Sequence, residues 1–302
     1  MTSAIKVAAA QLTPVFLNVD QTLAKASDAI KEAGKNGADL IVFPEAFISG
    51  YPDWVWTIPN SKSVILNDLY VALIENAVSV PDVNTDILCK AAKAANTNVV
   101  IGINERNTES SGGSLYNSLL FIDNNGVILG KHRKLIPTSG ERLIWGQGDG
   151  STLRSYETTA GKIAGLICWE NYMPLARQAI YESGAQILAS ATWDKSPNWL
   201  QSMQHIAREG GLFIISVCML IRMDDIPDKY EFKSFYPDKR EFINTGNSCI
   251  ISPSGKMLVG PLEGKESILY ADLNMNEILA AKRMFDVAGH YSRPDVFDFK
   301  LK

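Results

Sequence analysis

The feature that most constrains the fold is a regular alternation of short apolar runs with longer amphipathic segments. The apolar runs have the length and composition of buried strands, and they are "IKVAAAQL", "DLIVFPE", "NVVIGI", "KIAGLIC", "QILAS" and "LFIISVCM". Helical periodicity marks the segments 20–36, 62–78, 82–96, 173–183 and 199–210. We expect Asp20 to cap the first of these helices. The alternation predicts an α/β protein.

Two hairpin signals interrupt the alternation. "SLLFIDNNGVILGKH" places Asn125 and Gly126 between apolar runs, and "SCIISPSGKMLVG" turns at Ser254 and Gly255. Hairpins join antiparallel strands, so the sheets are expected to be mixed rather than purely parallel. "SILYADL" is the last clear strand. Because no Gly/Ser-rich, Pro-rich or low-complexity tract divides the chain, residues 1–302 are expected to form a single domain.

Composition and charge exclude several classes of protein. With 46% hydrophobic and 21% charged residues, the 302-residue chain has an ordinary globular composition and is long enough to bury a sizeable core. A net charge of −4 gives no indication of binding to nucleic acid or to an anionic membrane. No apolar run has the length of a membrane span. The start, "MTSAIKVAAAQLTP", is interpreted as a first strand rather than a signal peptide, so we expect a cytoplasmic protein.

The cysteines and histidines give no sign of a metal site. The four cysteines are far apart without CxxC spacing, and the three histidines form neither HExxH nor a pair at helical spacing. In a cytoplasm the thiols are expected to be reduced.

Cys168 has a sequence context that a structural cysteine does not need. It follows an apolar strand and precedes "WEN" and a helix start, with Pro174 in the first helical turn. A helix N-terminus lowers the pKa of a neighbouring thiol, and its backbone N–H groups can stabilise an oxyanion. Core packing is the better interpretation for Cys89, Cys218 and Cys249, which lie inside a helix or strands. The sequence therefore predicts Cys168 as a nucleophile.

Two further stretches place charged groups near strand ends. Glu45 in "LIVFPEAFISGYP" stands at the carboxyl end of a strand, where apolar and aromatic neighbours would raise its pKa and suit it to act as a general base. In "GKHRKLIPTSGERLIWGQGDG", Lys134 follows a strand and would hold negative charge beside a thiolate, with Glu141 nearby. The alternatives are a solvent-facing acid and a solvated basic face. The Gly-rich loop lacks the GK[ST] ending of a phosphate site.

Together these stretches resemble the nitrilase branch of the carbon–nitrogen hydrolase superfamily. "FPEAFISGYP", "HRKLIPTSGERLIWGQGDG" and "CWENYMPLAR" occur in the family's order, within a resemblance that spans nearly the whole chain. It implies a four-layer α-β-β-α sandwich with two mixed sheets. It also implies a catalytic set of Glu45, Lys134 and Cys168, with Glu141 as a second glutamate. Such proteins need no metal or organic cofactor and commonly form dimers, so at least a homodimer is expected.

The resemblance implies hydrolysis of a small-molecule nitrile to the carboxylic acid and ammonia, through thioimidate and acyl-thioester intermediates on Cys168. "CWE" is similar to true nitrilases, whereas amidase and carbamoylase relatives usually carry a different residue after the cysteine. Aliphatic, arylaliphatic and cyano-amino-acid nitriles and hydrogen cyanide are all candidate substrates. Three alternatives stay open: an amidase or carbamoylase with the same triad, a thiol hydrolase that pairs Cys168 with His132 or His205, and a non-catalytic scaffold.

The substrate pocket is predicted from residues at or just after strand ends. Tyr51, Trp169, Thr192 and Trp193 are candidate walls around an apolar nitrile, with ordinary core packing as the alternative for the aromatic residues. Residues 222–245 lack both the helical and the strand period. They are expected to form a long loop that covers the pocket or makes a subunit contact.

Overall fold

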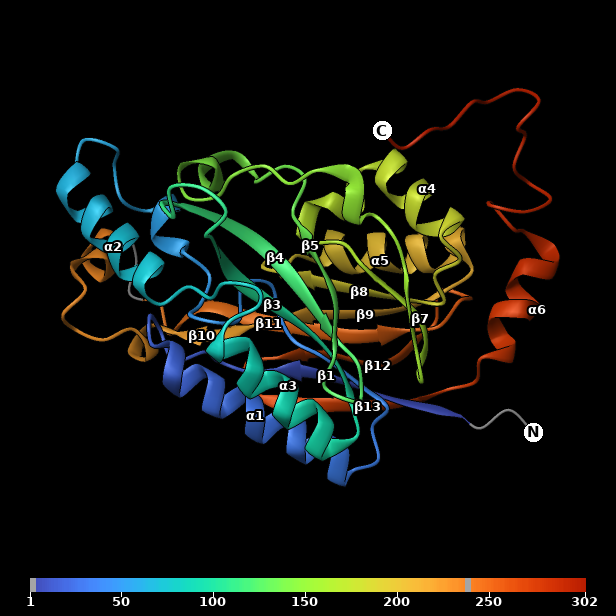
Figure 1. Ribbon diagram of the computed structural model, residues 1–302, viewed down its shortest axis with the longest axis horizontal. Helices are drawn as coiled ribbons and strands as arrows, with labels where there is room; N and C mark the ends of the chain where they lie inside the picture. The colour runs from blue at the N-terminus through green and yellow to red at the C-terminus, as the bar shows by residue number, and fades with distance from the viewer. Residues whose placement is uncertain (1–3, 237–239) are drawn as a thin grey trace.

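The first of two mixed β-sheets contains the amino-terminal strands and the last strand of the chain (Figure 1). The computed structural model describes residues 4–236 and 240–302. In this sheet β1, β2 and β3 are parallel and the outer pairs are antiparallel. Its order is β13 (Ser267–Leu273), β1 (Ile5–Gln11), β2 (Leu40–Val42), β3 (Asn98–Asn107), β4 (Ser114–Ile122) and β5 (Ile128–Arg133).

The second sheet is built from the middle of the chain. Its central strands β7, β8 and β9 are parallel, the outer pairs are antiparallel, and β12 (Met257–Glu263) pairs with β11. Its order is β10 (Leu220–Arg222), β11 (Phe242–Ile251), β9 (Phe213–Cys218), β8 (Ile187–Thr192), β7 (Gly161–Gly165) and β6 (Tyr156–Thr158). The prediction of mixed rather than purely parallel sheets is confirmed.

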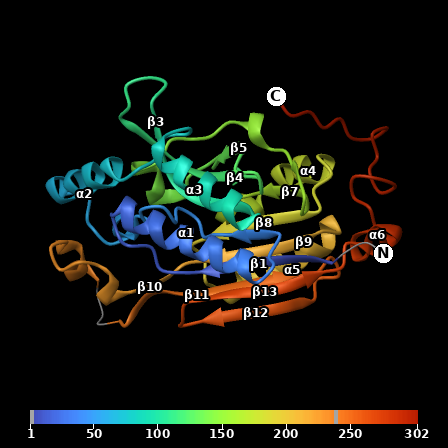
Figure 2. The same ribbon diagram turned by 60° about the horizontal axis from the view of Figure 1, so that its bottom comes forward.

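Helices cover the outer face of each sheet. One cluster of buried side chains joins α1 (Val19–Lys35) and α3 (Val83–Ala95) to the first sheet. Another joins α4 (Pro174–Glu182) and α5 (Pro197–Gly210) to the second. Helices α2 (Ser63–Glu75) and α6 (Asn276–Met284) lie at opposite ends of the molecule (Figure 2). The four-layer α-β-β-α sandwich is therefore confirmed. Within residues 4–236 and 240–302, no helix is long and apolar enough to cross a membrane.

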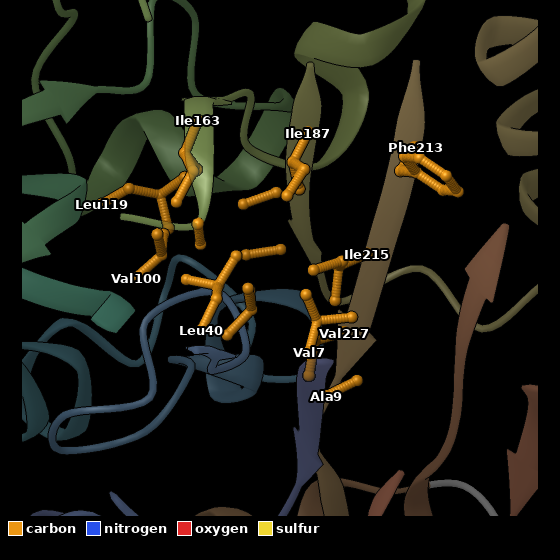
Figure 3. Close-up of a cluster of buried hydrophobic side chains, with 14 of the residues drawn as sticks. Val7, Ala9, Leu40, Val100, Leu119, Ile163, Ile187, Phe213, Ile215 and Val217 are labelled. Carbon is orange, nitrogen blue, oxygen red and sulfur yellow. The ribbon is translucent and has the colours of Figure 1, made fainter. Parts of the chain in front are cut away.

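The inner faces of the two sheets meet in a continuous apolar core (Figure 3). Val7 and Leu119 of the first sheet and Ile187 and Ile215 of the second are all fully buried there. Gly165 on β7 allows the close approach, because a Cβ at this position would lie only 2.6 Å from Cδ1 of Leu119. This packing fixes the two sheets relative to each other.

Both predicted hairpins are confirmed. β4 and β5 pair around the turn at Asn125 and Gly126, and β11 and β12 pair around Ser254 and Gly255. Gly126 and Gly255 have φ values of 79° and 81°, in the left-handed region that glycine enters without steric cost.

Other local predictions need correction. Helix α1 is capped by Asn18, whose side chain accepts a hydrogen bond from the backbone of Gln21, and Asp20 lies inside the first turn. The segment 222–245 is not a loop throughout, since its ends belong to β10 and β11. Between these strands Phe232 is buried against the body of the protein, while positions 237–239 lie outside the described residues. Helix α6 was not predicted.

Candidate active site

Glu45 lies in a turn that is held tightly against β3. After β2 ends, the backbone N–H of Ile48 donates to the carbonyl of Gly102 at 3.0 Å. A Cβ at Gly102 would lie 2.1 Å from the carbonyl oxygen of Pro44, so only glycine lets the turn come this close. Ala46 has a φ of 49°, a backbone conformation that residues other than glycine rarely adopt. Backbone packing therefore sets the position of the Glu45 carboxylate.

The Lys134 ammonium is buried between two carboxylates. Its Nζ donates to Glu45 Oε1 and to Glu141 Oε2, each at 2.8 Å. Burial alone would lower the pKa of Lys134, but the negative charges of Glu45 and Glu141 outweigh burial and raise it. The side chain therefore stays protonated at neutral pH.

The two oxygens of the Glu45 carboxylate have different surroundings. Oε1 accepts from Lys134 and, at 2.7 Å, from the side-chain amide of Asn117. Oε2 is buried and has no hydrogen-bond partner among residues 4–236 and 240–302. Burial raises the pKa of Glu45 against the opposing effect of Lys134, in the direction that the sequence predicted. A carboxylate anchored through one oxygen keeps the other free to exchange a proton with a bound molecule.

Cys168 occupies a strained backbone position between the second sheet and α4. Strand β7 ends at Gly165, and Cys168 opens a 3₁₀ turn over Cys168–Tyr172 with a φ of 51°. Such conformations persist only where the surrounding structure holds them, and they gather at functional sites. The hydroxyl of Thr192, at the end of β8, donates to the Cys168 sulfur at 3.2 Å.

The predicted lowering of the Cys168 pKa is wrong. Burial, assisted by the charge of Glu45, raises the pKa of the Cys168 thiol to about 12, although Lys134 acts in the opposite direction. Helix α4 begins only at Pro174, so the 3₁₀ turn rather than a longer helix adjoins the sulfur. Cys168 is consequently a thiol in the resting protein.

Glu141 joins the charged groups to an aromatic pair. Its Oε2 accepts from the backbone N–H of Thr138 at 2.6 Å in addition to Lys134, and its Oε1 accepts from the Tyr51 hydroxyl at 2.7 Å. The Tyr51 ring stacks on Trp193 with centroids 4.4 Å apart. Tyr51 thus connects the carboxylate to an aromatic surface.

The predicted wall residues have different surroundings. Tyr51 and Thr192 are buried and contact the charged groups or the sulfur. Trp169 follows Cys168 directly, but it is 50% exposed and its indole N–H donates to Asp194 at 3.0 Å. The Trp169 side chain therefore faces the surface rather than joining the buried groups.

The two histidines that were considered as bases have hydrogen-bond partners other than the Cys168 sulfur. The ring nitrogens of His132 contact Thr152 and Glu170. His205 lies on α5 with an exposed side chain and pairs with Glu209. In the described part of the chain, no group of three or more His, Cys, Asp or Glu side chains is arranged to hold a metal ion.

Sequence reasoning did not identify Asn117 and Glu170. Asn117 interrupts the apolar pattern of β4, and this break was the available signal. Glu170 stands in the "CWE" motif that was quoted for the resemblance, but no role was assigned to it.

Residues 6–283 match the carbon–nitrogen hydrolase family, and the chain belongs to this family. It is 42% identical over 295 residues to Nitrilase 2 of Arabidopsis thaliana, covering 95% of this chain and 85% of that protein. It is 40% identical over 309 residues to the bifunctional nitrilase/nitrile hydratase NIT4A of Nicotiana tabacum, covering 100% and 87%. The crystal structure of a carbon–nitrogen hydrolase from Helicobacter pylori G27 shares the fold, with a TM-score of 0.74 at 18% identity over 98% and 97% of the chains. The predicted nitrilase branch is confirmed by the nitrilase relatives.

Proposed function

We propose that this protein is a nitrilase that hydrolyses a small organic nitrile to the carboxylic acid and ammonia, with Cys168 as its nucleophile. The observation that carries the proposal is the buried Lys134 ammonium, held 2.8 Å from both Glu45 and Glu141 at the site of the Cys168 thiol. Similarity to curated nitrilases over nearly the whole chain supports the same reaction.

In the first step the Cys168 sulfur attacks the nitrile carbon. Because the pKa of this thiol is about 12, a base must take its proton as the carbon–sulfur bond forms. Oε2 of Glu45, for which the described part of the chain offers no hydrogen-bond partner, receives this proton and passes it to the nitrile nitrogen. The product is a neutral thioimidate, R–C(=NH)–S–Cys168.

In the second step Glu45 takes a proton from water, which adds to the thioimidate carbon. The Lys134 ammonium and the backbone N–H of Trp169 stabilise the charge that develops in the tetrahedral intermediate. Glu45 gives the proton taken from water to the nitrogen, so the intermediate is R–C(OH)(NH2)–S–Cys168. Glu45 then takes the hydroxyl proton and passes it to the amino group, ammonia leaves as the C=O bond forms, and an acyl thioester remains. A second water then releases the carboxylic acid and restores the Cys168 thiol.

The remaining site residues hold these groups in place. Glu141 fixes the Lys134 ammonium from the side opposite Glu45. Thr192 orients the Cys168 sulfur, and the stacked rings of Tyr51 and Trp193 form an apolar wall for the nitrile substituent. Trp169 contributes through its backbone rather than its indole ring.

An amidase or carbamoylase reaction on the same residues is the second candidate. The tobacco relative is named a bifunctional nitrilase/nitrile hydratase. An amidase would reach the same acyl thioester by attack of the Cys168 sulfur on an amide carbonyl and loss of ammonia. A tetrahedral intermediate that expels sulfur instead of ammonia would release an amide from a nitrile, which is nitrile hydration.

Paired assays of each nitrile with its amide separate these reactions. We expect ammonia and free acid from at least one of phenylacetonitrile, butyronitrile and β-cyanoalanine, without accumulation of the corresponding amide. Turnover of the amides alone would establish an amidase. No turnover of any nitrile in a wider panel would contradict the proposal.

The assembly, the domain organisation and the compartment belong to the same proposal. We infer that residues 1–302 act as one catalytic domain, because the two sheets share one core and both contribute to the site. We infer a homodimer or larger homo-oligomer, since large apolar side chains are exposed on α4 and α6, including Leu175 and Leu279. A cytoplasmic location agrees with four free cysteines. Light scattering of the purified protein measures the assembly.

A further inference from the structure

Glu170 is a buried carboxylate that the proposed reaction does not use. It is 2% exposed and lies two residues after Cys168. Its Oε2 accepts from the backbone N–H of Ile167 at 2.7 Å, and its Oε1 accepts from the backbone N–H of Leu135 at 2.6 Å. A carboxylate in a dry interior is costly unless donors surround it, so these bonds hold it firmly in one place.

The two backbone donors are the chain neighbours of the reacting groups. Ile167 directly precedes Cys168, and Leu135 directly follows Lys134. Lys134 comes after β5 of the first sheet, whereas Cys168 comes after β7 of the second. The Glu170 carboxylate therefore accepts from the backbone just beyond a strand of each sheet, beside the groups that follow those strands.

His132 orients this carboxylate from β5. Its Nε2 lies 3.1 Å from Oε2 and 3.2 Å from Oε1 of Glu170, and an ionised carboxylate only accepts, so the ring donates from Nε2. Its Nδ1 contacts the Thr152 hydroxyl at 2.9 Å, which fixes the ring. The imidazole is 1% exposed and its nitrogens are occupied, so it supports Glu170 rather than acting as a base on the sulfur.

We infer that Glu170, held by His132, is a positioning residue that sets the Lys134 ammonium relative to the Cys168 sulfur. Its link to Ile167 also begins the turn in which Cys168 has its strained φ of 51°, a conformation that the surroundings must enforce. The expected change in turnover rests on the proposed function. The expected change in the reactivity of the Cys168 thiol does not.

The test substitutes Glu170→Gln and compares Glu209→Gln as a matched control. Glutamine keeps the shape of glutamate but directs an NH₂ donor at one of the backbone N–H groups. Glu209 is also a partly buried carboxylate bonded to a histidine, but its partners Arg177, Tyr181 and His205 lie on the outer helices. Melting curves followed by circular dichroism establish that each variant is folded at the assay temperature.

For Glu170→Gln we expect kcat on phenylacetonitrile to fall about 100-fold, the loss that a misplacement of about 1 Å produces. We expect KM to change by less than about threefold, since substrate contacts are retained. Alkylation of Cys168 by iodoacetamide, followed by mass spectrometry of its peptide, should slow about tenfold because Lys134 no longer supports the thiolate as well. Glu209→Gln should stay within about twofold of the wild type in all three measurements.

A folded Glu170→Gln protein that matches Glu209→Gln in kcat and in alkylation rate would overturn the inference. If Glu170→Gln does not fold, His132→Gln provides the same comparison, because it keeps the carboxylate and removes the ring that aligns it. A wild-type protein without activity on any nitrile would refute the proposed function alone. The alkylation rates would still decide the role of Glu170.

Discussion

At the scale of single residues, the site combines a resting thiol with a permanently charged ammonium. Burial raises the pKa of Cys168 to about 12, and the neighbouring carboxylates keep the pKa of Lys134 above its usual value. In the proposed mechanism the sulfur depends on a base at the moment of attack, and Glu45 Oε2, which has no hydrogen-bond partner among the described residues, is positioned for this task. A site of this kind reacts with a bound substrate while its nucleophile stays protected against chance electrophiles.

Replacing the sulfur tests the nucleophile directly. Cys168→Ala should abolish ammonia release from nitriles and leave the melting temperature near that of the wild type. Cys218→Ala is the control, because Cys218 is also fully buried but lies inside β9. It should cost about 1 kcal/mol of stability and retain turnover. Equal turnover by the wild type and Cys168→Ala would show that another group attacks the nitrile.

The raised pKa of Cys168 predicts a specific pH profile for its alkylation. Only the thiolate reacts, and below a pKa of about 12 its fraction grows about tenfold per pH unit. The iodoacetamide rate at Cys168 should therefore rise steadily between about pH 7 and pH 9, with Cys168→Ala as the baseline. A rate that levels off near neutral pH would instead indicate a lowered pKa, as the sequence alone had suggested.

At the scale of elements, the Glu45 turn depends on a glycine in the adjacent strand. A Cβ at Gly102 would lie 2.1 Å from Pro44 O and 2.5 Å from Ala46 N, so Gly102→Ala must displace the turn. We expect a loss of about 1–3 kcal/mol in the free energy of unfolding by urea. We also expect a decrease of about 100-fold in kcat for nitrile hydrolysis.

The control for this substitution is Gly113→Ala. Gly113 lies in the β3–β4 connection, where an added Cβ would meet nothing closer than 3.7 Å. Turnover by Gly113→Ala should equal that of the wild type. If Gly102→Ala also turned over substrate at the wild-type rate, the Glu45 turn would tolerate displacement. Its close packing would then not determine the position of the Glu45 carboxylate.

Local signals in the sequence predicted the helices and strands better than they predicted the contacts between them. Asn125 and Gly126 form a hairpin turn because their own backbone preferences suffice, and an apolar run identifies β2 without reference to its neighbours. The importance of Gly102 comes from a turn that lies more than fifty residues earlier in the chain. No local pattern encodes such a contact.

The features of the site that the sequence did not predict depend on contacts between distant segments. Glu170 bonds to Leu135 from the other sheet, and Asn117 reaches Glu45 from β4. The Cys168 pKa was predicted in the wrong direction for the same reason, because its burial depends on how distant segments pack around it. The resemblance supplied Glu45, Lys134 and Cys168 as a set, and the structure brings their segments together.

At the scale of the whole molecule, the site exists only where the two sheets meet. The first sheet supplies Glu45 and Lys134, whereas the second supplies Cys168 and Thr192. Hydrogen bonds of Glu170 join the sheets locally, and the apolar core joins them globally. Stability of the sandwich and geometry of the site are therefore coupled.

Leu119 tests the contribution of the core between the sheets. Its side chain is fully buried against Gly165 of the opposite sheet, so Leu119→Ala leaves a cavity where the sheets touch. We expect a loss of about 2–5 kcal/mol in the free energy of unfolding, measured by urea titration. Val64→Ala on α2, where the side chain is 70% exposed, should change this free energy by less than about 0.5 kcal/mol. Equal effects of the two substitutions would show that the contact between the sheets contributes little, and that the outer helices hold the two halves of the site together.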